Sequence, residues 1–190
     1  MAQEYEAKIL NIDVGKLEQK FHSIGATKKS EHLFRSTSFD YQGFPLDKDS
    51  SWVRLRDDGT KVTLAYKKRV GVGNVHGKDG GMEEIEIIVD NYEKTAEFLL
   101  KIGLIVKFEQ EKKRVHWEKD SVDFDIDYWP KLKPYLEVEA KSWKEVDEAV
   151  LGLGFKLEDK VICSATQIYE MNGIRDKDYI SMTFGKWVRR

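Results

Sequence analysis

The chain has a single cysteine, no apolar run long enough to cross a membrane, and no internal repeat of fixed period. One cysteine, Cys163, excludes an intrachain disulfide, and its Val161-Ile162-Cys163 setting is typical of a small buried apolar residue. No stretch supplies the basic and apolar blocks of a secretory signal. We therefore expect a reduced, cytoplasmic protein without a membrane partner.

The chain also lacks an excess of charge of either sign. Its 32 Lys and Arg residues against 34 Asp and Glu residues leave a net charge of −2, which gives no field over the whole molecule to attract nucleic acid. The basic run at 67–69 is too short to be a nucleic-acid footprint. The four histidines show no metal-ligand spacing, although His116 shares the strand parity of Lys112 and Arg114. Any electrostatic function must be local.

What the chain does have is a surplus of charged residues, 35% against the usual quarter or so. They recur two apart inside segments that otherwise alternate like strands, so each set points to one face. A single such pair is typical of a solvated face, but repeated sets of acids and bases indicate carboxylates for a divalent metal and cations for phosphate oxygens. The sets are Glu4, Glu6 and Lys8; Arg54 and Arg56; Glu84 and Glu86; Lys112 and Arg114; Asp125 and Asp127; Glu137 and Glu139.

The pattern of elements predicts an α+β fold in one domain over residues 1–190. About eight amphipathic, mostly successive strands favour a closed eight-stranded antiparallel β-barrel with an ionic lumen and flanking helices. Capping residues and apolar stripes predict helices over about 13–25, 91–103, 142–154 and 163–173.

Two segments resist assignment from their pattern. The glycine-rich stretch 69–81 is predicted to be a flexible loop or lid, because it lacks the spacing of a Walker motif. Residues 174–190 form a C-terminal extension. Capping the mouth of the barrel, setting substrate size and making a homodimer contact all stay open as its role.

The segment Glu4-Tyr5-Glu6-Ala7-Lys8 resembles the ExExK signature of the CYTH superfamily, the triphosphate tunnel metalloenzymes. This superfamily includes class IV adenylyl cyclases, thiamine triphosphatases and inorganic tripolyphosphatases. The similarity continues in order through residues 4–140 and departs at Leu132-Lys133-Pro134, where many relatives have Leu-Gly. The segments that carry it further are Arg54-Leu55-Arg56, Thr63-Leu64-Ala65-Tyr66-Lys67, Glu84-Ile85-Glu86, Lys112-Lys113-Arg114, Asp127 and Glu137-Val138-Glu139.

The resemblance implies an eight-stranded antiparallel tunnel and a role for each matching residue. It implies that Mg²⁺ or Mn²⁺ is bound by Glu4, Glu6, Asp127, Glu137 and Glu139. It implies that a triphosphate is bound by Lys8, Arg54, Arg56, Lys67, Lys112 and Arg114, with Glu84 and Glu86 bracing these bases. Glu6 and Lys8 are the catalytic candidates, Lys8 by orienting the attacking water.

The implied activity is metal-dependent hydrolysis of inorganic tripolyphosphate or of a nucleoside or thiamine triphosphate. A class IV adenylyl cyclase is an alternative, because it uses the same metal and phosphate ligands. A non-catalytic polyphosphate-binding module is another, although it would not need both pairs of metal acids. Trp52 and Trp129 are candidates to stack on an organic group of the substrate.

Overall fold

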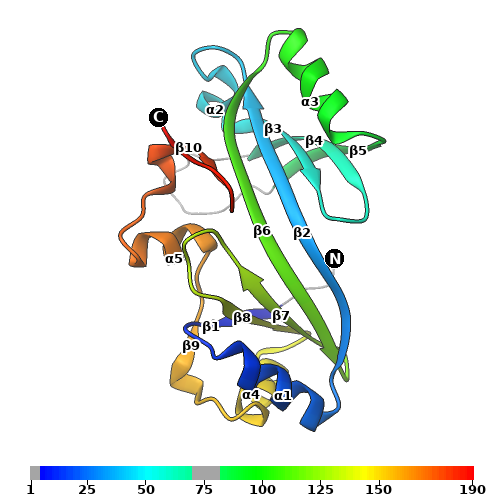
Figure 1. Cartoon of the computed structure of the whole chain (residues 1–190), viewed down its shortest axis with the longest axis vertical. Helices are drawn as coiled ribbons and strands as arrows, with labels where there is room; N and C mark the ends of the chain where they lie inside the picture. Colours follow the sequence, from blue (N-terminus) through cyan, green and yellow to red (C-terminus); the bar gives the residue numbers. More distant parts are fainter. Residues whose placement is uncertain (1–4, 70–81) are drawn as a thin grey trace. The chain divides into compact units, whose positions relative to one another are not determined.

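The computed structural model describes residues 5–69 and 82–190 (Figure 1). Glu4 and nearly all of the predicted loop at 69–81 lie outside these residues. No helix in the described part of the chain is long and apolar enough to span a membrane. The helices are α1 (Val14–Ile24), α2 (Pro45–Lys48), α3 (Tyr92–Lys101), α4 (Trp143–Gly152) and α5 (Ala165–Met171). The strands are β1 (Tyr5–Ile9), β2 (Thr27–Asp40), β3 (Ser51–Asp57), β4 (Val62–Arg69), β5 (Met82–Val89), β6 (Ile105–Lys119), β7 (Val122–Tyr128), β8 (Tyr135–Ala140), β9 (Lys160–Val161), β10 (Tyr179–Met182) and β11 (Trp187–Arg189).

Most helices begin at the capping residues that the sequence indicates. The side chains of Asp13, Asn91 and Ser142 each accept a hydrogen bond from a backbone N–H in the first turn of α1, α3 and α4. Helix α1 ends at Gly25, whose φ of 79° is the left-handed conformation that glycine adopts without strain. Helix α5 starts after Ser164, which forms a capping box with Gln167.

The prediction of a closed eight-stranded barrel is wrong. Over the described residues the strands form an open, eleven-stranded and mostly antiparallel sheet whose path begins at β5 and ends at β9. Alternation along a strand specifies which face is apolar, but it does not specify which strand edges are hydrogen-bonded. The edge of β1 that faces away from β8 is taken by β9, where Lys8 aligns with Val161.

The chain divides into two compact units. Unit 1 comprises 1–33 and 112–176, and unit 2 comprises 34–111 and 177–190. Strands β2 and β6 contribute residues to both.

In unit 1, strands β6, β7, β8 and β1 are consecutive neighbours, and helix α4 packs on β8 and β1 (Figure 1). The apolar core includes Phe124 and Val138 from the sheet, Phe21 from α1 and Val146 from α4. Each of these side chains is almost fully buried. The other face of the same strands is therefore left to the charged residues of alternate parity.

In unit 2, strands β2, β3, β4 and β5 are consecutive neighbours, and Phe39, Leu55 and Leu99 form a smaller core. Residues 177–190 of the C-terminal extension belong to this unit. Strand β10 pairs in parallel with β6, with Ser181 aligned to Glu109, and the Phe184 N–H donates to the Glu111 carboxylate at 2.9 Å. The extension therefore covers part of the edge of β6.

Candidate functional site

The register of unit 1 places charged side chains in rows across four neighbouring strands. Residues directly opposite in an antiparallel pair share a face, so each row lies on one side of the sheet. One row runs from Glu6 through Glu139 and Asp123 to Glu118, the next from Lys8 through Glu137 and Asp125 to His116, and the third contains Asp127 and Arg114. Carboxylates outnumber cationic groups on this face, which we call the acidic face.

Arg114 is the centre of the hydrogen bonds on the acidic face. Its Nε and Nη2 donate to the two carboxylate oxygens of Asp127 at 2.6 and 2.7 Å. Its Nη1 donates to Asp125 at 2.6 Å, and Nη2 also donates to Glu137 at 3.0 Å. Lys112 Nζ adds a bond to Asp127 at 3.1 Å. Both oxygens of Asp127 are therefore engaged by cationic side chains.

Burial and charge act against each other in this network. Desolvation opposes ionisation of Asp127, which is 1% exposed, but the hydrogen bonds and charges of Arg114 and Lys112 outweigh it and lower the pKa of Asp127. For Asp125 the desolvation dominates, and its pKa is raised despite Arg114. Desolvation also lowers the pKa of Lys112. For Arg114 it is outweighed by Asp127, so the pKa of the guanidinium is raised.

Lys8 lies at the β1 end of the second row. Its ammonium contacts the Glu6 carboxylate and lies 3.8 Å from Glu137 Oε2. Lys8 is only 6% exposed and Glu137 only 8% exposed, whereas the Glu6 side chain is 38% exposed. The arrangement leaves a water-accessible carboxylate beside a buried ammonium.

A second charged face lies in unit 2, on strands β3, β4 and β5. The register places Arg54 in line with Glu86, and Lys67 in line with Glu84 and Trp52. Lys67 Nζ lies 2.7 Å from Glu84, and Arg54 Nη2 lies 4.0 and 3.9 Å from the carboxylates of Glu84 and Glu86. With Arg56 added from β3, cationic groups outnumber acids among these residues, which we call the basic face.

Within the described part of the chain, Arg54 is the member of the basic face with an unsatisfied hydrogen-bond donor. Burial and the neighbouring charge of Arg56 lower its pKa. Its Nε is buried and has no hydrogen-bond partner among the described residues. Arg56 itself lies over the Phe34 ring at 5.2 Å. A buried guanidinium donor without an acceptor is a position that an oxyanion could complete.

The predicted site residues thus fall into two groups, and Glu4 lies outside the described residues. The structure brings together Glu6, Lys8, Lys112, Arg114, Asp127, Glu137 and Glu139 in unit 1. It brings together Arg54, Arg56, Lys67, Glu84 and Glu86 in unit 2.

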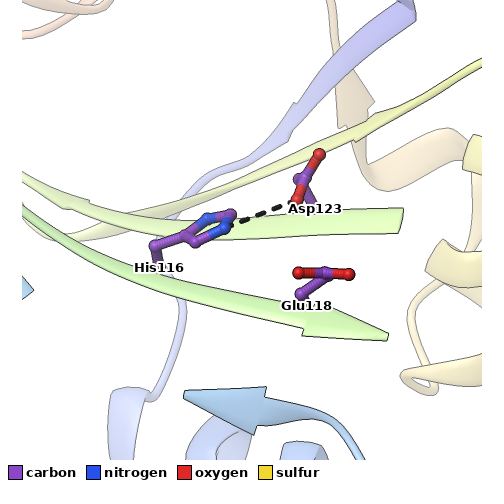
Figure 2. A group of neighbouring side chains, drawn as sticks. All are labelled: His116, Glu118 and Asp123. Atoms are coloured by element: carbon purple, nitrogen blue, oxygen red, sulfur yellow. Dashed lines mark ion pairs between the residues drawn. The ribbon is translucent and has the colours of Figure 1, made fainter. Parts of the chain in front are cut away.

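Sequence reasoning missed a group of possible metal ligands at the β6–β7 hairpin. Ligand atoms of His116, Glu118 and Asp123 all lie within 4.8 Å of one another (Figure 2). The histidine spacings give no sign of this group, because its other members come from across the hairpin. The signal available in the sequence was the pair Asp120-Ser121, two residue types that are common in turns. In the structure both have positive φ values, of 50° and 65°, and they form the two-residue connection that sets Glu118 opposite Asp123.

Comparison with known families gives a match that covers most of the chain. The CYTH domain model matches residues 2–166. The chain belongs to the CYTH family. No significant match was found among curated proteins.

Solved structures share the fold of this CYTH chain at low sequence identity. A candidate adenylate cyclase from Vibrio parahaemolyticus aligns with a TM-score of 0.62 at 12% identity, covering 88% of this chain and 97% of that one. A candidate adenylyl cyclase from Hippeastrum, described as having a dominant triphosphatase activity, aligns at 0.54 and 15% identity, covering 90% and 97%. The PH1012 protein of Pyrococcus horikoshii aligns at 0.56 and 20% identity, covering 84% and 94%.

Proposed function

We propose that this CYTH protein hydrolyses a phosphoanhydride bond of a triphosphate with the help of a divalent metal ion. Inorganic tripolyphosphate and nucleoside or thiamine triphosphates are the candidate substrates. One observation carries the proposal: in a chain of this family, one charged face has an excess of carboxylates and another has an excess of cations. A metal ion and a polyphosphate are the ligands that these two excesses match.

The acidic face supplies the donors for Mg²⁺ or Mn²⁺. Glu6, Glu137 and Glu139 occupy adjacent strands on one face, and their hard oxygens suit either ion. We assign the metal to these three and to Glu4. Since Arg114 and Lys112 engage both oxygens of Asp127, we assign Asp127 mainly to positioning Arg114. When bound, the ion neutralises phosphoryl oxygens and lowers the pKa of bound water.

The cationic side chains bind and orient the phosphate chain. On the basic face, Arg54 offers an unpartnered Nε, and Glu84 holds Lys67 in place. Arg56 adds a further guanidinium, whose planar fork matches a phosphate. On the acidic face, Arg114 and Lys112 are fixed by carboxylates, so their geometry is set before substrate arrives.

Lys8 is the residue that we assign to the attacking water. Its buried ammonium is held by Glu6 and Glu137 and can donate a hydrogen bond that orients the water oxygen toward phosphorus. Glu6 contributes by fixing Lys8 and by its proposed place among the metal ligands.

The test is an activity assay over several substrates. Purified protein is incubated with tripolyphosphate, ATP or thiamine triphosphate in Mg²⁺ or Mn²⁺, and free phosphate and cyclic AMP are measured. We expect phosphate release that stops when EDTA removes the metal. Cyclic AMP in place of phosphate would identify a cyclase. Binding without turnover of any substrate would identify a polyphosphate-binding module.

A further inference from the structure

The β6–β7 hairpin of unit 1 brings one imidazole and two carboxylates to a common point (Figure 2). His116 Nε2 lies 3.5 Å from Asp123 Oδ1, and the hairpin register sets Glu118 opposite Asp123. Two atoms bound to one ion at about 2.1 Å each lie about 3.0–3.4 Å apart. The separation of Nε2 and Oδ1 is therefore long for a hydrogen bond but close to that of two ligands on one ion.

The imidazole is oriented by a carboxylate behind it. His116 Nδ1 lies 2.8 Å from Asp125 Oδ1, and the other Asp125 oxygen accepts from Arg114. Asp125 is only 7% exposed, so the ring is anchored from the buried side. When Nδ1 donates to Asp125, the neutral ring has its lone pair on Nε2, directed at Asp123. Metal-binding histidines commonly have this carboxylate support.

The charge around this point favours a cation. Glu118 and Asp123 are two members of the row of acids that continues to Glu139 and Glu6 on the next strands. Like charges directly opposite each other destabilise a sheet. Lys29 Nζ lies 3.4 Å from Glu118, but its side chain is 46% exposed and can move away. The end of this row thus combines electrostatic repulsion with a nearby nitrogen ligand, His116, which ends the neighbouring row.

We propose that His116, Glu118 and Asp123 bind one divalent transition-metal ion of the Zn²⁺ type. An imidazole with two carboxylates suits such an ion better than Mg²⁺, which prefers oxygen ligands alone. The three side chains are 27–43% exposed, so the ion enters from solvent and keeps water in its remaining positions. This site differs from the metal site of the proposed reaction, because it includes a nitrogen ligand and the ligands proposed there are all carboxylate oxygens.

The experiment is calorimetric titration of ZnCl₂ into the full chain in excess Mg²⁺, which fills sites made only of oxygen ligands. We expect one Zn²⁺ per chain. His116→Gln and Asp123→Asn should each weaken Zn²⁺ binding by at least about 10- to 100-fold. That is the usual effect of losing a residue that only supports a metal ligand, and these two residues are themselves proposed ligands. His32→Gln, which removes a histidine elsewhere, and Glu6→Gln should leave Zn²⁺ affinity unchanged.

Circular dichroism of each variant checks that the fold persists. If His116→Gln unfolds, Asp123→Asn alone tests whether the hairpin binds Zn²⁺. Absence of Zn²⁺ binding would overturn the proposal. So would binding that survives both hairpin substitutions, or that is lost with Glu6→Gln, because the ion would then occupy the oxygen-only set. Since the readout is binding, failure of the proposed hydrolysis would leave this result intact.

Discussion

At the scale of single residues, the organisation of the acidic face depends on how Arg114 and Asp127 share a buried ion pair. Asp127 is almost fully buried and accepts both prongs of the Arg114 fork. Such a pair is costly to break, because the remaining partner stays buried with an uncompensated charge. The pair is therefore expected to hold the neighbouring acids in place as well.

Replacing the carboxylate tests this directly. Asp127→Asn should lower the free energy of unfolding near neutral pH by about 3 kcal/mol, since Arg114 and Lys112 lose their anionic partner. Urea unfolding of the variant and of the wild type measures the difference. A loss below about 1 kcal/mol would mean that the pair is no stronger than a surface ion pair.

The pH dependence of that difference follows from the lowered pKa of Asp127. A depressed folded-state pKa gives a stabilisation that is fully present above the unfolded value of about 3.9 and is lost as the pH falls through the lower folded value. Urea titrations from about pH 7 to about pH 3 should therefore show a constant gap between wild type and Asp127→Asn above about pH 5, narrowing at the acid end. A gap that widens on acidification would contradict the assigned direction.

Glu6 is expected to matter for turnover more than for stability. Glu6→Gln should lower metal-dependent phosphate release by at least about 100-fold, because it removes a proposed metal ligand. It also removes the closer of the two carboxylates at the buried Lys8 ammonium, so a smaller loss of unfolding free energy accompanies the loss of turnover. Steady-state kinetics in Mg²⁺ and Mn²⁺ measure the fall. Glu148→Gln, on the exposed face of α4, is the matched control and should keep the wild-type rate.

Arg56 is expected to act on substrate binding. Arg56→Ala removes a charge-assisted contact of about 1.5–3 kcal/mol, so kcat/KM should fall by about 10- to 100-fold. Lys61→Ala, in the exposed turn after β3, removes a cation from the same unit and should change kcat/KM little. If kcat/KM were the same for Arg56→Ala and Lys61→Ala, the assignment of Arg56 to substrate binding would be wrong.

At the scale of elements, capping chemistry predicted helix positions well because it is local in sequence. Asp13, Asn91 and Ser142 begin their helices as expected. The four-residue α2 and the two-residue β9 were missed, because neither is long enough to show a hydrophobic period. Strand β9 is the element that occupies the edge of β1.

A cap substitution measures how much this local chemistry contributes. Ser142→Ala removes the acceptor for the Glu145 backbone N–H and should reduce the free energy of unfolding by about 1 kcal/mol. Thermal and urea unfolding measure the change. Lys144→Ala, in the first turn of the same helix, should have a smaller effect, since its side chain is largely exposed.

Strand parity predicted which side chains share a face, but it could not predict register. The two-residue period places Glu137 with Glu139, and Asp125 with Asp127. Only the ladder shows that Glu137 lies opposite both Lys8 and Asp125, or that His116 ends that row. Register depends on contacts between segments far apart in the chain, which a single sequence does not specify.

At the scale of the whole molecule, a nearly neutral chain separates its charge into an acidic face in unit 1 and a basic face in unit 2. Because positive and negative charges nearly cancel over the whole chain, the net charge of −2 does not reveal this separation. Composition therefore excluded an electrostatic field over the whole molecule, but it was compatible with an electrostatic function at a local site. Each face is therefore tested by a substitution of its own, the acidic face for metal binding and the basic face for phosphate binding.

The most direct measurement is phosphate release from tripolyphosphate by the wild type and by Glu137→Gln and Arg54→Ala, with Mn²⁺ and with EDTA. Our account predicts turnover that requires the metal and falls in both variants, with unfolding transitions retained. Turnover that persists in EDTA, or that neither substitution reduces, would contradict the assignment of the two faces to a metal-dependent triphosphatase.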